Sequence, residues 1–436
     1  MSSIWNWELK QRPAVSGEVY APAIRRFGPR FRPLSSTQSS IQSSVLAMFS
    51  ARLAFAAETN ALSKAKAKRL AAGLPVLDLS DSNPANAGFA WSAADLGPLL
   101  RRDGIQRQDP NPLGLASART AVSDYYSSRG ARVPVDQLFL TASTSEAYSW
   151  VFKLLCNPGD EVLVPEPAYP LLEVIAALEG VTLRPYQLVQ LAGEWVIDAT
   201  TLVVNRQTRA VLCVNPSNPT GAFVGRRDRD VLRGFALKHG LAIVCDEVFL
   251  DYPAEGAASP GTWAGEANVM TFVLSGLSKV ALAPQLKLGW IVVAGPATAT
   301  LEACRRLEHI ADAFLSVNTP AQLALPDLLR RAEPLRALVR TRVAQGEATL
   351  RAWAVSSGSG CAVLPRPAGW TAILTLPPGV HEDRFLMNAL SEGVWAHPGY
   401  FYGMPTTLPS VVLSLLTPPD ALSAGLQAME RALKRT

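Results

Sequence analysis

From about residue 138 onwards, short apolar runs alternate with segments that have the spacing of helices. The runs are rich in Val, Ile and Leu and show little polar alternation, which is typical of strands buried on both faces. Helices are expected between them, including 146–155 and 229–239, the second closed by Gly240. The pattern predicts an α/β domain with a mostly parallel sheet and helices on both faces. The expected strands are 138–140, 161–164, 210–214, 241–245, 269–274 and 288–293.

The rest of the chain divides into three further parts around this large domain, which we place at 91–302. Residues 1–45 hold arginines among prolines and then a Ser/Gln-rich stretch, so we expect a partly disordered N-terminal extension. Residues 46–90 form a segment that we assign to the smaller domain. Residues 303–436 begin with a long helical stretch and then offer strands at 370–376 and 411–416. That pattern predicts a smaller α+β domain.

Composition excludes several classes of function. Apolar residues make up 48% of the 436 residues and charged ones 18%, which favours a globular protein with a large core. No apolar run approaches the roughly 18 residues of a membrane-spanning helix, so we expect no membrane role. The net charge of +5 is spread over the whole chain without Lys/Arg blocks, too dilute to indicate nucleic acid as a partner. An anionic small ligand stays possible.

The five cysteines indicate a reducing compartment. They are widely spaced, with no Cys-x-x-Cys pair and no histidine at the spacing of a metal site, so we expect free thiols and no metal. The first residues show no secretory signal, and the cytoplasm is the expected location. A transit peptide is an alternative for residues 1–45, because that stretch is basic and rich in serine.

Polar residues follow four of the predicted strands directly, at the ends where open α/β sheets bind ligands. After 138–140 the chain runs through Ser143, Thr144 and Ser145 into a helix. Backbone amides at such a helix start bind phosphate groups. The same residues could equally form an ordinary helix cap, with Ser145 capping and Glu146 in the first turn.

The other three motifs carry an amide, a carboxylate and an amine. Asn215–Gly221 reads Asn-Pro-Ser-Asn-Pro-Thr-Gly, which could also be only a tight loop. Asp246 ends the next strand, where an acid could simply cap a neighbouring group. Lys279 follows the strand at 269–274, and a partly desolvated lysine there can lose its proton and form a Schiff base. A single lysine in a loop is usually a solvated charge.

Together, in this order, these motifs and the Leu-Gly-Trp at 288–290 resemble the pyridoxal-phosphate-dependent aminotransferases of class I/II, which have fold type I. The resemblance covers about residues 46–436. It implies that pyridoxal 5′-phosphate is the cofactor, that 91–302 bind it and that 46–90 contribute to the active site. It also implies a homodimer with active sites shared between subunits.

The resemblance assigns the catalytic roles. Lys279 would form the Schiff base and later carry the proton between the substrate Cα and the cofactor. Asp246 would pair with the ring nitrogen and keep it protonated. Asn218 would bind the phenolic oxygen and contact the substrate. Tyr169 would stack on the ring, with core packing as its alternative.

Further residues are implied to bind phosphate and substrate. Ser143, Thr144 and Ser145 would hold the phosphate, with Ser278 near it and Lys287 opposite. Asn83 lies in the segment 78–84, which resembles the one that brings backbone to the substrate carboxylate. Residues 397–400 resemble the turn of the small domain that faces the site.

Four positions depart from the family pattern. Lys287 stands where an arginine usually grips phosphate, and Phe249 where many relatives have a tyrosine; Tyr252 cannot be assumed to replace that hydroxyl. Gln108 stands where relatives present a tyrosine to the neighbouring subunit. Val412 stands where an arginine binds the α-carboxylate of the substrate. We expect either that Arg366 replaces this arginine or that the donor is not held by an α-carboxylate.

The sequence therefore predicts an enzyme that moves an amino group from an amino donor to a 2-oxo acid by a ping-pong route. A lyase or decarboxylase on the same scaffold is the alternative, because fold and cofactor do not fix the reaction. A non-catalytic protein that binds pyridoxal phosphate ranks third. An attached DNA-binding module would favour it, and residues 1–45 are too interrupted by proline for one.

Overall fold

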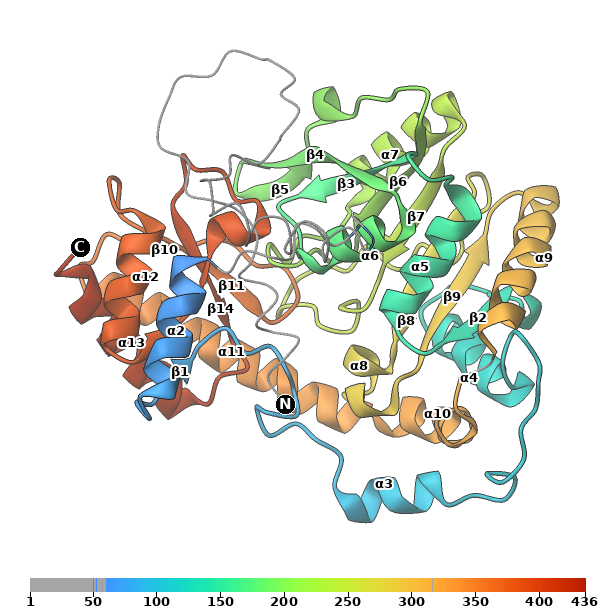
Figure 1. Ribbon diagram of the computed structural model, residues 1–436, viewed down its shortest axis with the longest axis horizontal. Helices are drawn as coiled ribbons and strands as arrows, with labels where there is room; N and C mark the ends of the chain where they lie inside the picture. The colour runs from blue at the N-terminus through green and yellow to red at the C-terminus, as the bar shows by residue number, and fades with distance from the viewer. Residues whose placement is uncertain (1–49, 51, 53–59, 316) are drawn as a thin grey trace, which may run out of the picture.

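The computed structural model describes residues 50, 52, 60–315 and 317–436. It contains a large domain built on an eight-stranded sheet and a smaller domain built on a four-stranded sheet (Figure 1). The predicted N-terminal extension at 1–45 lies outside the described residues. Within the described part of the chain, no helix combines the length and the apolar character needed to cross a membrane.

The large sheet is mostly parallel, as predicted. Its strands lie in the order β2-β9-β8-β7-β6-β3-β4-β5, and the pairs made by β9 and by β5 are antiparallel while the rest are parallel. The strands are β2 (Leu138–Thr141), β3 (Glu161–Glu166), β4 (Thr182–Leu191), β5 (Glu194–Ile197), β6 (Thr208–Val214), β7 (Ala242–Asp246), β8 (Thr271–Gly276) and β9 (Gly289–Ala294).

All six strands expected from apolar runs are present, and their ends differ by at most two residues from the prediction. The pattern missed β4 and β5, which form a hairpin at the edge of the sheet. Most residues of β4 are at least partly exposed, so this strand lacks the continuous apolar run of a strand buried on both faces.

Helices cover both faces of this sheet because side chains of successive strand residues point to opposite faces. In β7, Ile243 and Cys245 pack into one apolar core, and Ala242 and Val244 pack into the other. The first core includes α3 (Ala93–Leu100), α4 (Ala116–Ser127), α7 (Arg226–His239) and α10 (Thr319–Arg331). The second includes α5 (Thr144–Leu155), α6 (Leu171–Glu179) and α9 (Ala297–Phe314). Helix α7 ends at Gly240, whose φ of 64° is the left-handed cap expected from the sequence.

The smaller domain has an antiparallel sheet in the order β10-β11-β14-β13. The strands expected at 370–376 and 411–416 are present as β11 (Thr371–Thr375) and β14 (Ser410–Ser414). The remaining elements of this part are β10 (Ala362–Val363), β12 (Val394–Trp395), β13 (His397–Pro398), α11 (Glu333–Ser356), α12 (Glu382–Ser391) and α13 (Pro419–Leu433). A short helix, η6 (Gly399–Tyr402), connects β13 and β14. The short helices of the large domain are η3 (Val135–Gln137), η4 (Ala199–Thr201), α8 (Leu277–Val280) and η5 (Pro284–Leu286).

The N-terminal part of the described chain packs on the smaller domain. Helix α2 (Ala61–Ala71) lies beside α12, and β1 (Leu77–Asp78) pairs in parallel with β12 (Figure 1). Residue 303, where we expected the smaller domain to begin, falls inside α9, and Leu307 and Ala311 of α9 belong to a core of the large domain. The packing therefore favours a boundary near the start of α11, whose Val339 is the first residue after α10 in the small-domain core.

Candidate active site

The polar motifs meet at the carboxyl ends of three adjacent strands. Asp246 is the last residue of β7, and Asn215 follows the end of β6, with its backbone amide 2.8 Å from the Asp246 carbonyl. Lys279 lies on α8, which follows β8 directly. Because β6, β7 and β8 are neighbours and parallel, segments that lie far apart in sequence reach one edge of the sheet.

The amine of Lys279 has no polar partner in the described part of the chain. Its Nζ lies 4.8 Å from the ring centre of Trp370 and 5.7 Å from that of Phe249. Burial lowers the pKa of Lys279 to about 8, against the opposing charges of Asp246 and Asp81. A lysine in this state loses its proton near neutral pH and becomes a nucleophile.

The main chain of α8 is held by side chains from three other segments. The carbonyl of Lys279 accepts from the Tyr252 hydroxyl at 2.6 Å, that of Val280 from Arg336 Nη1 at 3.0 Å, and that of Ala281 from Trp91 Nε1 at 2.7 Å. The Tyr252 hydroxyl, which the sequence left without a role, is thus occupied with the backbone of Lys279. These bonds satisfy the carbonyls at the end of a four-residue helix and fix the lysine in place.

Asp246 is 9% exposed, and each of its side-chain oxygens accepts one hydrogen bond from the described residues. Oδ1 accepts from the Val248 amide at 3.0 Å and Oδ2 from the Tyr148 hydroxyl at 2.8 Å. Burial raises the pKa of Asp246, while these two donors and the charge of Lys279 oppose the rise. No sequence motif indicated Tyr148, which lies 98 residues from Asp246 along the chain.

The start of α5 leaves backbone amides available to an anion. Ser143, not Ser145, is the N-cap, and its Oγ accepts from the Glu146 amide at 3.2 Å. The Glu146 carboxylate accepts from the Ala142 amide. No acceptor among the described residues takes the amides of Thr144 and Ser145, so these two donors stay available to a phosphate group.

Two facing glycines let this helix start approach the sheet. Gly276 of β8 pairs with Gly289 of β9. A Cβ on Gly289 would lie 2.9 Å from the Ser143 carbonyl carbon, and one on Gly276 would lie 3.3 Å from Thr144 Oγ1. Side chains at these positions would push α5 away from the end of β8. The free amides, the close approach and the unpaired amine of Lys279 fit a phosphorylated aldehyde cofactor.

Three further predicted residues line the same region. Asn218 Oδ1 accepts from Thr371 Oγ1 of β11 at 3.3 Å, so the small domain contacts the loop at this point. Tyr169 lies 6.4 Å, ring centre to ring centre, from Tyr402. Val412 of β14 is 1% exposed and belongs to an apolar cluster with Tyr402, against which Tyr169 packs. The structure thus brings Val412 to the side of the small domain that faces Tyr169.

Three other residues predicted to bind phosphate or substrate differ in exposure and in hydrogen bonding. Ser278 lies on α8 and is partly buried. Lys287 is exposed, in a left-handed conformation at the end of η5. Asn83 Oδ1 accepts from the Ala85 amide at 3.1 Å, and the Asn83 amide donates to Asp81. The Asn83 carbonyl oxygen is therefore engaged in a local turn.

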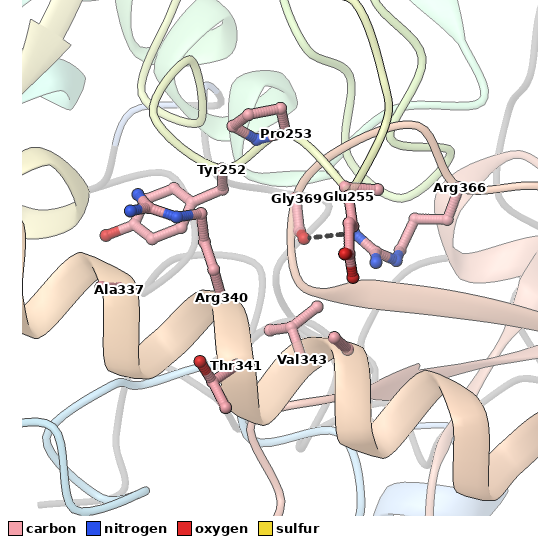
Figure 2. A pocket seen from close by; sticks show the side chains of 11 residues that line it. Tyr252, Pro253, Glu255, Ala337, Arg340, Thr341, Val343, Arg366 and Gly369 are labelled. Carbon is pink, nitrogen blue, oxygen red and sulfur yellow. Dashed lines mark hydrogen bonds between the residues drawn. The ribbon is translucent and has the colours of Figure 1, made fainter.

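Arg366 is already paired within the protein. Its Nε and Nη2 donate to Glu347, and its Nη1 donates to the Gly369 carbonyl at 2.7 Å, as Figure 2 shows for the latter bond. The side chain lines a cavity of about 430 Å³ between the loop at Tyr252 and helix α11 (Figure 2). For Arg366 to bind a substrate carboxylate, its pair with Glu347 must break, so its substrate role stays a prediction.

Comparison with solved structures defines the class of fold. The alanine aminotransferase of Pyrococcus furiosus matches with a TM-score of 0.78 over 90% of this chain and 99% of its own, at 20% identity. The chain therefore has the aminotransferase fold, as the sequence predicted.

Comparison of sequences defines the family. The profile described as aminotransferase class I and II matches residues 100–409. The chain is 30% identical to the glutamate-pyruvate aminotransferase AlaA of Escherichia coli K12 over 327 residues, covering 73% of this chain and 79% of that protein. It is 31% identical to AlaA of Haemophilus influenzae over 260 residues, covering 59% of this chain and 64% of that protein, just under two thirds of its length.

The protein belongs to the class I and II aminotransferase family. This confirms the fold class and the family that the sequence predicted. It also confirms the prediction of a transaminase. The lyase and the non-catalytic alternatives are not favoured.

Glu247, next to Asp246, is a second buried carboxyl group at this edge. It accepts from the Trp263 amide at 2.7 Å, from Thr262 Oγ1 and from Asn215 Nδ2, so it holds the loop at 261–263 against the end of β7. Burial raises the pKa of Glu247 to about 7, despite these donors. Its ionisation therefore costs stability within the physiological pH range.

Glu247→Gln should remove this pH dependence. A carboxyl group whose pKa rises on folding contributes stability below its unfolded pKa near 4.5, and loses it as the pH rises to about 7. The variant does not titrate, and its new amide can donate to Thr262. Its free energy of unfolding, relative to the wild type, should improve by up to about 3 kcal/mol from pH 4.5 to 8.

Urea unfolding of the cofactor-free protein across that range measures this change. Glu302→Gln is the control, because its arginine partners lower the pKa of Glu302 to about 2, outside the range. A difference between Glu247→Gln and the wild type that stays constant with pH would contradict the assignment.

Proposed function

We propose that the protein is a pyridoxal-phosphate-dependent transaminase whose cofactor attaches to Lys279. The observation that carries this proposal is a half-buried amine that has no polar partner among the described residues, together with Asp246 and the free amides at the start of α5. The cofactor, when bound, supplies an electron sink for the charge left when the substrate loses its Cα proton.

Each catalytic residue has a group suited to its proposed role. Lys279 Nζ attaches the cofactor and then moves the proton at the substrate Cα, because its lowered pKa lets it both accept and donate near neutral pH. Asp246 accepts a hydrogen bond from the ring nitrogen and favours its protonated form. Asn218 binds the phenolic oxygen and contacts the substrate, and the Tyr169 ring stacks on the cofactor.

The phosphate is proposed to lie at the start of α5, on Ser143, Thr144 and Ser145, with Ser278 beside it. The positive end of the helix dipole adds to the two free amides there. Lys287 would balance the phosphate charge as a flexible point charge, without the two-pronged contact of an arginine.

The substrates are proposed to be an amino donor and a 2-oxo acid. The relatives named as glutamate-pyruvate aminotransferases support this substrate class. Val412 suggests a different donor preference, because a buried valine offers no hydrogen bond to an α-carboxylate. We infer a donor that is bulkier or less anionic than aspartate or glutamate.

The proposed attachment site predicts that borohydride reduction labels Lys279. Reduction fixes the lysine to the cofactor, and mapping of the labelled peptides identifies the residue. Lys279→Ala should abolish turnover while leaving some cofactor binding through the phosphate contacts. Lys153→Ala, which removes a surface lysine paired with Glu179, should keep the label. A label on any other lysine would refute the assignment.

The donor preference predicts weak activity with aspartate and glutamate. Loss of one charge-assisted contact corresponds to a roughly 10- to 150-fold lower kcat/KM. Steady-state kcat/KM values over a panel of amino acids and amines measure the preference. If aspartate or glutamate is the best donor by a wide margin, and Arg366→Ala leaves that order intact, our interpretation of Val412 is wrong.

We further propose a homodimer in the cytoplasm. The resemblance supports the dimer, since Gln108 lies in the segment that relatives present to a neighbouring subunit, and twofold dimers are the commonest assemblies. The five cysteines, all free, support a reducing compartment. Sedimentation at assay concentration should show a dimer, and a fully active monomer would exclude shared active sites.

A further inference from the structure

Tyr148 contacts Asp246, the residue proposed to bind the ring nitrogen of the cofactor. Its hydroxyl donates to Asp246 Oδ2 at 2.8 Å, and the two residues are 8% and 9% exposed. The other oxygen of Asp246 accepts only the Val248 amide among the described donors. Tyr148 is therefore the one side chain of the described residues that donates a hydrogen bond to this carboxylate.

The position of Tyr148 on α5 links two parts of the site. Ser143, which caps α5, lies five residues before it, at the proposed phosphate position. The Tyr148 ring packs against Phe152 on the same helix, with ring centres 6.1 Å apart. The same helix, α5, thus carries both the amides proposed to bind phosphate and the side chain that donates to Asp246. One helix would therefore position the groups that bind the phosphate and the ring nitrogen of the cofactor.

The chemistry of Asp246 makes this donor consequential. A carboxylate removed from water favours its protonated form, and hydrogen bonds to the charged form counteract that preference. A protonated Asp246 cannot keep a proton on a ring nitrogen beside it. The hydrogen bond from the Tyr148 hydroxyl therefore favours the ionised carboxylate, with the shared proton on the ring nitrogen.

We propose that Tyr148 is a positioning residue, whose hydroxyl keeps Asp246 ionised and oriented so that the shared proton stays on the ring nitrogen of the cofactor. This inference rests on the proposed function. Tyr148 itself touches neither the substrate nor the reacting atoms, and acts only through Asp246.

The test compares Tyr148→Phe with the wild type on two cofactors: pyridoxal phosphate and an analogue with a C–H group in place of the ring nitrogen. The rate of Cα proton removal, measured in a single half-reaction, should fall about 10-fold or more in the variant with the natural cofactor. With the analogue the variant and the wild type should differ little, because the analogue has no nitrogen to protonate. An equal loss with both cofactors would mean a merely structural role and overturn the proposal.

Tyr186→Phe is the matched control. Tyr186 is also buried, at 1% exposure, but donates to the uncharged carbonyl of Leu212 at 2.9 Å. This variant should lose stability and show the same rate ratio between the two cofactors as the wild type. If its ratio changes as that of Tyr148→Phe does, the effect is not specific to the contact with Asp246.

A second readout needs no cofactor. Because burial raises the pKa of Asp246, its contribution to stability is present at low pH and is lost as the pH rises through that pKa. Removing the Tyr148 hydroxyl raises the pKa of Asp246 further. The stability deficit of Tyr148→Phe in the cofactor-free protein should therefore widen with rising pH, while that of Tyr186→Phe stays constant. A constant deficit for Tyr148→Phe would count against the proposal.

Failure of the proposed function would look different from failure of this inference. If Lys279 does not carry the cofactor, the wild type gives no borohydride label at Lys279, whereas the stability comparison still reports on Tyr148 and Asp246. Should Tyr148→Phe not fold, 3-fluorotyrosine at position 148 keeps the size and strengthens the donor. Its half-reaction rate should then change with the natural cofactor and not with the analogue, and no change with either would overturn the proposal.

Discussion

The candidate site depends on one electrostatic condition: a half-buried amine at the end of a parallel sheet has no salt bridge to any described residue. Lys279 Nζ lies over the rings of Trp370 and Phe249, with Asp246 and Asp81 acting on it only through their charge. An ion pair at Lys279 would raise its pKa and remove the nucleophile. The carboxylates nearby are instead engaged with Tyr148, Val248 and Asn83.

The fold supplies this condition through its topology. Because β6, β7 and β8 are parallel neighbours, a carboxylate, an amide loop and a lysine arrive at one edge without any of them lying on a long loop. The hydroxyl of Tyr252 and the side chains of Arg336 and Trp91 then bind the carbonyls of α8. The lysine is held by its main chain, which leaves its side chain free to react.

Most strands of the large sheet and the polar residues at their ends were predictable, because their signal lies in short stretches of sequence. Strands buried on both faces have continuous apolar runs, so their ends and the polar residues that follow, such as Asp246 and Lys279, could be located. The edge hairpin of β4 and β5 could not, because its half-exposed strands lack that pattern. Pairings such as Tyr148 with Asp246 and Arg366 with Glu347 join distant parts of the chain, and no local spacing encodes them.

Arg336 connects the smaller domain to the segment that carries Lys279. It lies on α11, the helix that leads into the smaller domain, and its guanidinium contacts both Asp251 and the Val280 carbonyl. Asp251 also pairs with Arg129 of the segment after α4. Arg336 thus links three segments: α11, the loop that carries Asp251, and the residue next to Lys279. One guanidinium therefore ties the start of α11 both to the loop at Asp251 and to the main chain beside Lys279.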